Sequence, residues 1–140
     1  MPDFNQTLIN DLRAHRGTAT SGPFVGRPLL ILTTTGAKTG VLRSTPLVYS
    51  HDADHLVIVA SKGGAPTHPA WYHNLVAHPR VTVEVGGETY QATARVADPV
   101  ERRRLYDQHA TDFPGFKDYE VRTDRVIPVV TLVREAAKAA

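Results

Sequence analysis

Two glycine-containing loops carry residues that could hold an anion. Gly36-Ala37-Lys38-Thr39-Gly40 follows an apolar, β-branched run, and Arg43 comes three residues after it. Such a turn can present backbone N–H groups while the two cations add positive charge, which suits a phosphate. The loop has neither the Walker A spacing nor the glycine spacing of dinucleotide-binding folds. A plain β-turn with a solvated lysine is the alternative.

The second loop is Ala60-Ser61-Lys62-Gly63-Gly64, where two glycines would let backbone approach a ligand closely. A short helix predicted to begin at Pro69 would direct unpaired N–H groups toward a ligand. Trp71, the sole tryptophan, stands in that helix and could cover a planar ring. The alternatives are a flexible loop with an exposed lysine and a tryptophan that belongs to the core.

Acidic residues are distributed unevenly along the chain. None occurs in the 40 residues from Leu12 to His51, and none occurs from His55 to Val83. The first window contains Arg13, Arg16, Arg27, Lys38 and Arg43. This positive excess predicts an anionic ligand. We expect a small molecule rather than nucleic acid, because the basic residues are sparse and no DNA-reading motif occurs.

Other chemistry has weaker support in the sequence. His68, His73 and His78 are five residues apart, which does not place them on one helix face, and the chain has no cysteine and no HExxH motif. We therefore expect no metal site. Ser61-Lys62 could imitate a Ser–Lys nucleophile pair, although no GxSxG motif supports acyl transfer. The aromatic residues Phe113, Phe116 and Tyr119 predict either an apolar lid over a planar substrate or the core of a helical cap.

The elements that must position these residues are those of one α+β domain. The chain has 140 residues, 41% of them hydrophobic and 21% charged, with a net charge of +2. That composition is typical of a single globular domain spanning residues 1–140. We expect an N-terminal helix and loop over residues 1–27, a small closed or split β-barrel over 28–133, and a frayed tail over 134–140.

The hydrophobic pattern predicts a first helix over 3–16, six strands, and a helix from Pro99 to about Ala110 capped by Asp98. Pro46 within the second strand indicates a sheet edge or a bulge. The six strands are predicted over residues 29–35, 43–51, 56–60, 81–85, 90–96 and 126–133.

Five strings, in this order and spacing, resemble the deazaflavin-dependent nitroreductase family of actinobacteria. They are LLILTTTGAKTG, RSTPLVY, VIVASKGGAPTHPAWYHNL, HPRVTVEVGGETYQATAR and FPGFKDYEVRTDRVIPVVTL. The resemblance covers residues 28–133. It implies a split β-barrel like that of small FMN-binding oxidoreductases, and it implies the cofactor coenzyme F-420, an 8-hydroxy-5-deazaflavin with a phosphodiester and an oligoglutamate tail.

The resemblance also implies contacts, residue by residue. Four residues would meet the phosphate and tail, and the others would line the ring side, bind the deazaflavin and its linker, or complete the pocket. The tail contacts would be Lys38, Thr39, Gly40 and Arg43; the ring side Thr45, Pro46 and Val48; the deazaflavin and linker Val59, Ala60, Ser61 and Lys62; and the remaining pocket Ala70, Trp71 and Asn74.

One departure from the family bears on the substrate. Phe113 and Phe116 stand where members that reduce nitroimidazole prodrugs carry tyrosines, so Tyr119 alone keeps a hydroxyl that can donate a proton. We therefore expect reduction of a quinone or a similar activated planar acceptor, with Tyr119 catalytic, and little reduction of nitroimidazoles. An F-420 carrier without turnover and an FMN-binding barrel are the alternatives.

The sequence also bears on location and assembly. No apolar run approaches the roughly 20 residues of a membrane span. The N-terminus lacks the basic-then-apolar pattern of a signal peptide. We expect a cytoplasmic protein without stable membrane insertion. A homodimer is left open.

Overall fold

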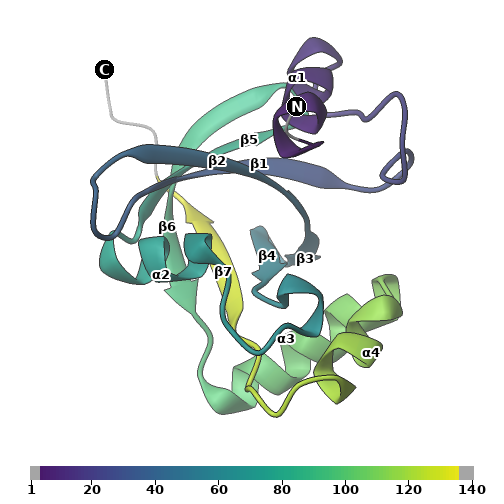
Figure 1. Cartoon of the computed structure of the whole chain (residues 1–140), viewed down its shortest axis with the longest axis vertical. Coiled ribbons are helices and arrows are strands. Elements are labelled where there is room, and N and C mark those ends of the chain that lie inside the picture. The colour runs from purple at the N-terminus through teal and green to yellow at the C-terminus, as the bar shows by residue number, and fades with distance from the viewer. Residues whose placement is uncertain (1–3, 136–140) are drawn as a thin grey trace.

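The computed structural model describes residues 4–135 as one curled sheet with helices packed around it (Figure 1). Asp3 and residues 136–140, where helix and tail were also predicted, lie outside the described residues. The elements are α1 (Phe4–Ala14), β1 (Leu29–Thr35), β2 (Leu42–Val48), β3 (Ser50–Asp52), β4 (His55–Val59), the 3-10 turn η1 (Lys62–Gly64), α2 (Ala70–Ala77), β5 (Arg80–Val85), β6 (Glu88–Val96), α3 (Pro99–Asp112), α4 (Gly115–Val121) and β7 (Val129–Arg134).

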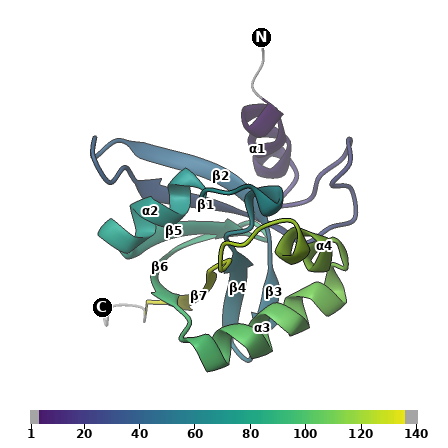
Figure 2. The ribbon, with the colours of Figure 1, turned by 60° about the horizontal axis from the view of Figure 1, so that its bottom comes forward.

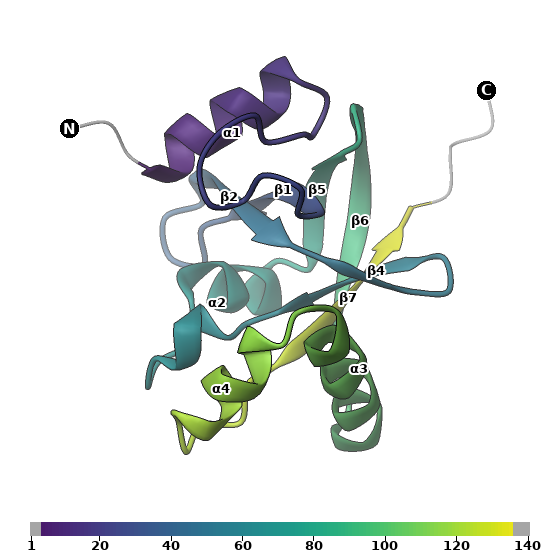
Figure 3. The same ribbon diagram turned by 90° about the vertical axis from the view of Figure 1, so that its right-hand side faces the viewer.

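The sheet has the strand order β2-β1-β5-β6-β7-β4-β3, and each neighbouring pair is antiparallel. The sheet is strongly curled, and the chain passes directly from β2, at one edge, toward the hairpin that contains β4 (Figure 3). The predicted α+β class and the split barrel are confirmed.

The predicted strand 43–51 is in fact two strands separated by Tyr49. β2 pairs with β1, and β3 pairs with β4 at the other end of the sheet order. The chain therefore changes from one sheet edge to the other at this residue. Pro46 lies in β2, opposite Ile31. Because β2 is an edge strand, it has no neighbour on its open side, and the N–H that proline lacks is not needed for a hydrogen bond there.

Alternation along β1 divides the core into layers. Leu30 and Leu32 face the interior of the barrel and join its main cluster, which also contains Trp71. Leu29 and Ile31 point to the outer face, where Leu8, Ile9 and Leu12 of α1 cover them. A third cluster, between β4, β7 and α3, includes Val57, Val59, Leu105 and Tyr106. α1 and α3 therefore cover parts of the outer face, and α2 contributes Trp71 to the interior cluster (Figure 2).

The structure shows where two helices and the last strand begin. Asp98 caps α3, because its carboxylate accepts the N–H of Glu101 at 2.8 Å. Pro69 is the extended residue before α2 and not its first helical residue. The last strand begins at Val129 and not at Val126, which is 69% exposed, because pairing starts only after Pro128.

Candidate functional site

The β1–β2 turn that carries Lys38 is built by its own hydrogen bonds. Gly36 N–H donates to Val41 O, Gly40 N–H donates to Gly36 O, and the N–H of Val41 donates to the hydroxyl of Thr39. A Cβ at Gly36 would lie 2.5 Å from that hydroxyl, so the turn needs glycine there. Gly40 has φ +70° and closes the turn.

Asn74 of α2 fixes this turn against the helix. Its Oδ1 accepts the N–H of Ala37 at 3.0 Å, and its Nδ2 donates to Thr34 Oγ1 at 3.1 Å. These bonds leave the N–H groups of Lys38 and Thr39 without a protein acceptor among residues 4–135. Two successive free amides next to an ammonium form an anion-binding arrangement.

A cavity of about 840 Å³ opens beside this turn, and it brings together half of the predicted cofactor contacts. Seven predicted residues line it: Lys38, Thr39, Arg43, Thr45, Ala70, Trp71 and Asn74. Neither Lys38 nor Arg43 forms an ion pair with any carboxylate in the described part of the chain. The cavity is thus an open, positively charged space bounded by a buried tryptophan.

Trp71 belongs to the core and to the cavity at once. Its ring is 7% exposed and packs in the main hydrophobic cluster, while the side chain also forms part of the cavity wall. The core and ligand-covering interpretations of this tryptophan are therefore compatible.

The other predicted cofactor residues lie away from this cavity. Pro46 and Val48 are on the opposite face of β2 from Thr45, and Val48 packs against the cluster under α1. Val59 and Ala60 are buried in the core. Ser61 and Lys62 form the next turn, where Lys62 donates to Thr67 Oγ1 at 3.2 Å.

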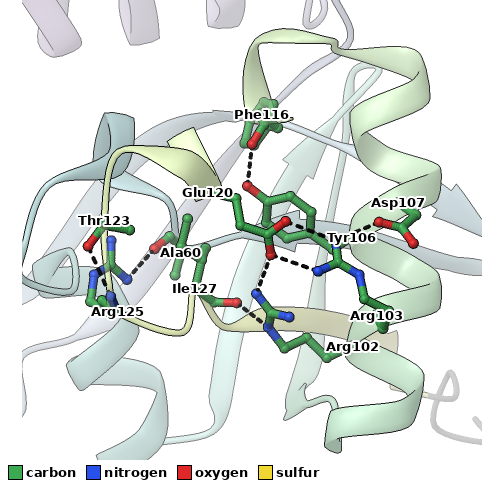
Figure 4. Close-up of polar contacts among 10 residues, drawn as sticks. All are labelled: Ala60, Arg102, Arg103, Tyr106, Asp107, Phe116, Glu120, Thr123, Arg125 and Ile127. Atoms are coloured by element: carbon green, nitrogen blue, oxygen red, sulfur yellow. Dashed lines mark hydrogen bonds and ion pairs between the residues drawn. The ribbon is translucent and has the colours of Figure 1, made fainter. Parts of the chain in front are cut away.

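Arg125, which the sequence did not single out, fixes that second turn. Its guanidinium donates to the carbonyl oxygen of Ala60 at 3.1 Å (Figure 4). It also donates to the carbonyl oxygens of Ser61 (2.7 Å) and Ala65 (3.1 Å), and it lies 2.7 Å from His68 Nδ1. Burial, the charge of Arg125 and the charge of His73 together lower the pKa of His68. No local motif marks Arg125, because the partners of its guanidinium are 57 or more residues away in sequence.

The N-terminal half of α1 also lines the main cavity. Asn5, Gln6 and Ile9 reach it from outside the predicted barrel. The sequence predicted a helix here but assigned it no ligand contact, since apolar residues at a spacing of four indicate only a buried face.

Phe113, Phe116 and Tyr119 do come together, in and before α4. They line a second cavity of about 460 Å³ with the loop that leads into β1, including Arg27 and Pro28. In Figures 1 and 2 this loop and α4 lie on one side of the molecule, and α2 and the β1–β2 turn lie on the other. Gly64 in η1 packs closely against α4, because a Cβ there would come within 2.8 Å of the carbonyl of Tyr119.

Charged and polar contacts hold α4 against α3. Glu120 accepts hydrogen bonds from Arg102 and Arg103, and Tyr106 donates its phenol to the carbonyl of Phe116 (Figure 4). Burial raises the pKa of Glu120, but the bonds from the two arginines outweigh it and leave the pKa below its usual value. Burial raises the pKa of Tyr106 to about 12, so its phenol stays protonated.

His109 is buried behind the aromatic residues of α4. Its Nδ1 lies 2.7 Å from the hydroxyl of Ser50, and its ring contacts Phe113 and Phe116. Its Nε2 has no hydrogen-bond partner among residues 4–135. Burial lowers the pKa of His109 to about 4, so the ring is neutral near pH 7.

Residues 4–135 contain no group of three or more His, Cys, Asp or Glu side chains placed to hold a metal ion. Within the same range no helix is long and apolar enough to cross a bilayer.

Comparison with known proteins gives consistent matches. The sequence model of the family described as F420H(2)-dependent quinone reductase matches residues 7–134. An F420H(2)-dependent quinone reductase of Mycobacterium tuberculosis strain H37Rv is 44% identical over 110 residues, which are 76% of this chain and 74% of that protein.

Two solved structures also match. One is titled as an F420-H2 dependent reductase; it is 39% identical, with a TM-score of 0.69 over 76% of this chain and 94% of that one. The other is described as a domain-swapped dimer; it is 39% identical, with a TM-score of 0.70 over 76% of this chain and 80% of that one.

Proposed function

The chain belongs to the F420H(2)-dependent quinone reductase family, and on that premise we propose that it uses reduced coenzyme F-420 to reduce a quinone. The observation that carries the proposal is the main cavity. It combines unpaired cations, two free backbone amides and a tryptophan wall, which suits a cofactor with a polyanionic tail and a planar ring.

Different residues of the main cavity would bind different parts of the coenzyme. Lys38, Arg43 and the amides of Lys38 and Thr39 would take the phosphate and tail, and Trp71 would bound the ring. The coenzyme supplies a hydride when it is bound. The turn at Ser61 and Lys62, which Arg125 holds, would border the deazaflavin ring. This turn follows β4 and leads to Gly64, which packs against α4.

The acceptor would occupy the second cavity. The coenzyme ring would then extend from Trp71 past the second turn toward α4, because the two cavities share no lining residue and hydride transfer needs the two rings in contact. Phe113 and Phe116 offer apolar ring faces and edges to a planar quinone, and Tyr119 offers a hydroxyl. Tyr119 would donate the proton that the reduced oxygen needs. Tyr119→Phe should then slow quinone turnover by up to about 100-fold with F-420 affinity unchanged.

A titration followed by a turnover assay tests the proposal. F-420 and FMN are titrated separately against the protein and followed by cofactor fluorescence, after which menadione is added to protein with reduced F-420. We expect micromolar binding of F-420, no comparable binding of FMN, and re-oxidation on adding menadione. Equal affinity for both cofactors would favour the FMN alternative, and binding without re-oxidation would favour the carrier.

We also propose that two copies of the chain associate. The support is the 39% identical structure described as a domain-swapped dimer, together with the two edge strands β2 and β3 that the sheet leaves without a second neighbour. Light scattering should then give about twice the chain mass of 15.3 kDa.

A further inference from the structure

Arg27 is a cation on the aromatic cavity that the proposed function leaves without a role. The cavity is lined on one side by Phe113, Phe116 and Tyr119 and on the other by Arg27 and its neighbours. Arg27 is exposed and has no hydrogen bond or ion pair from its side chain to residues 4–135. Its charge is therefore available to a ligand in the cavity.

The loop that carries Arg27 is anchored at both ends. Phe24 packs against the cluster under α1, and the N–H of Arg27 donates to Phe24 O at 3.1 Å. On the other side, Pro28 O accepts the N–H of Tyr49, and Leu29 is 3% exposed in β1. The backbone of Arg27 is thus held at the cavity rim, and only its side chain is free to move.

The opposite wall provides few polar groups. Phe113 and Phe116 cannot donate hydrogen bonds, so Tyr119 and Arg27 are the donors whose side chains line the cavity. Asp112 lines it as well, and its carboxylate would repel an anion. No ion pair joins Asp112 to Arg27, so neither charge neutralises the other by direct contact.

Reduction of a quinone makes an anion in this cavity. Bound F-420H2 would supply the hydride with its electron pair, and one quinone oxygen would be left negatively charged. Tyr119 or solvent would give that oxygen its proton, so that the quinone gains two electrons and two protons and the coenzyme loses two electrons and two protons. A cation beside the ring would stabilise such an oxyanion, and it would also attract a quinone that is already anionic.

We propose that Arg27 is a substrate-binding residue that selects quinones with an anionic oxygen substituent on the ring, the acidic hydroxyquinones. This proposal rests on the proposed function for the identity of the acceptor site. A cavity of about 460 Å³ is large enough for a two-ring quinone. The apolar wall then contacts the quinone ring, and Arg27 binds the anionic oxygen at the edge of that ring.

The test compares two quinones of nearly the same size. 2-Hydroxy-1,4-naphthoquinone is ionised at neutral pH, and menadione carries a neutral methyl group at the same position. Each is titrated by calorimetry into the full chain, first alone and then saturated with oxidised F-420, so that binding is measured without turnover. The chain has no cysteine to which menadione could add.

We expect the wild-type protein to bind the ionised quinone three- to tenfold more tightly than menadione. Arg27→Gln should abolish this preference while leaving menadione affinity within twofold, and Arg27→Lys should retain most of it. Asp112→Asn should increase the preference. Arg95→Gln removes an equally exposed arginine that lines neither cavity, and it should change nothing.

Equal affinity for the two quinones in the wild-type protein, or a preference that survives Arg27→Gln, would overturn the inference while F-420 binding and menadione reduction still stand. Failure of F-420 to bind would instead overturn the proposed function, and the titrations of the coenzyme-free chain would still test Arg27.

Discussion

Two regions of the molecule use the same kind of residue in opposite ways. At the β1–β2 turn, Lys38 and Arg43 lie at the edge of a large cavity and have no carboxylate partner within residues 4–135. At the α3–α4 end, three consecutive arginines, 102–104, each pair with an acid: Arg102 and Arg103 with Glu120, and Arg104 with Asp52. Unpaired cations are available for a ligand, whereas these paired cations hold α3 against α4 and β3. If the proposed function is correct, this difference separates binding residues from structural ones better than residue type does.

The comparison predicts that acid destabilises the α3–α4 end first. His109 has a pKa of about 4 in the folded protein and 6.5 as its ordinary value. Between these two values the unfolded chain binds the proton and the folded chain does not. Stability should therefore fall as pH drops from 6.5 toward 4, by roughly 3 kcal/mol at 1.36 kcal/mol for each pKa unit, and His109 should contribute no further loss below that range.

Urea unfolding at a series of pH values measures this loss. Carboxylates that accept hydrogen bonds, Glu120 and Asp52 among them, add their own losses at lower pH, because their folded pKa values are also depressed. His109→Leu should flatten the profile between pH 6.5 and 4 at the cost of leaving the Ser50 hydroxyl unpaired. His78→Gln, at an exposed position, should leave the profile as it is.

At the opposite end, the comparison predicts changes in affinity without changes in stability. A hydrogen bond to a charged group contributes about 1.5–3 kcal/mol. Lys38→Ala or Arg43→Ala should thus weaken F-420 binding roughly 10- to 150-fold, at about 1.4 kcal/mol for each factor of ten. Fluorescence titration measures the affinity, and thermal unfolding without ligand should be unchanged. Lys117→Ala, an exposed lysine on α4, is the matched control. Unaltered affinity in both variants would show that the turn does not hold the tail.

The sequence predicted the fold well because its evidence was local. Period-two alternation in residues 81–96 and glycine at the turn between β5 and β6 are sufficient to predict a hairpin. The break at Tyr49 was missed, because the apolar pattern of 43–51 continues through it and only pairing with different partners separates β2 from β3.

The site was predicted less completely, because part of it depends on residues that are far apart in the sequence. Lys38 and Trp71 carry local signals, a glycine turn and a singular aromatic residue, and both line the cavity. Arg125 and Asn74 act through partners that are 37 or more residues away, so only the resemblance pointed to Asn74 and nothing pointed to Arg125. Successive side chains of a strand point to opposite faces of the sheet. This alternation in β2 could have predicted that Thr45 lies on one face and that Pro46 and Val48 share the other.

The smallest expected effect concerns the paired arginines that hold α4 against α3. Glu120→Gln keeps the shape of the side chain but removes the charge that Arg102 and Arg103 share. Arg102 is mostly buried, with 14% of its side chain exposed, and it keeps its bond to Ile127 O, so the loss of stability should be about 1 kcal/mol. Because α4 carries Phe116 and Tyr119, the KM for menadione should rise while F-420 affinity stays within twofold. Asp118→Asn, on the same helix and without an ion pair, is the control for urea unfolding and for KM. A Glu120→Gln variant that loses F-420 affinity while its menadione KM is unchanged would mean that the two ends do not divide binding and structure in this way.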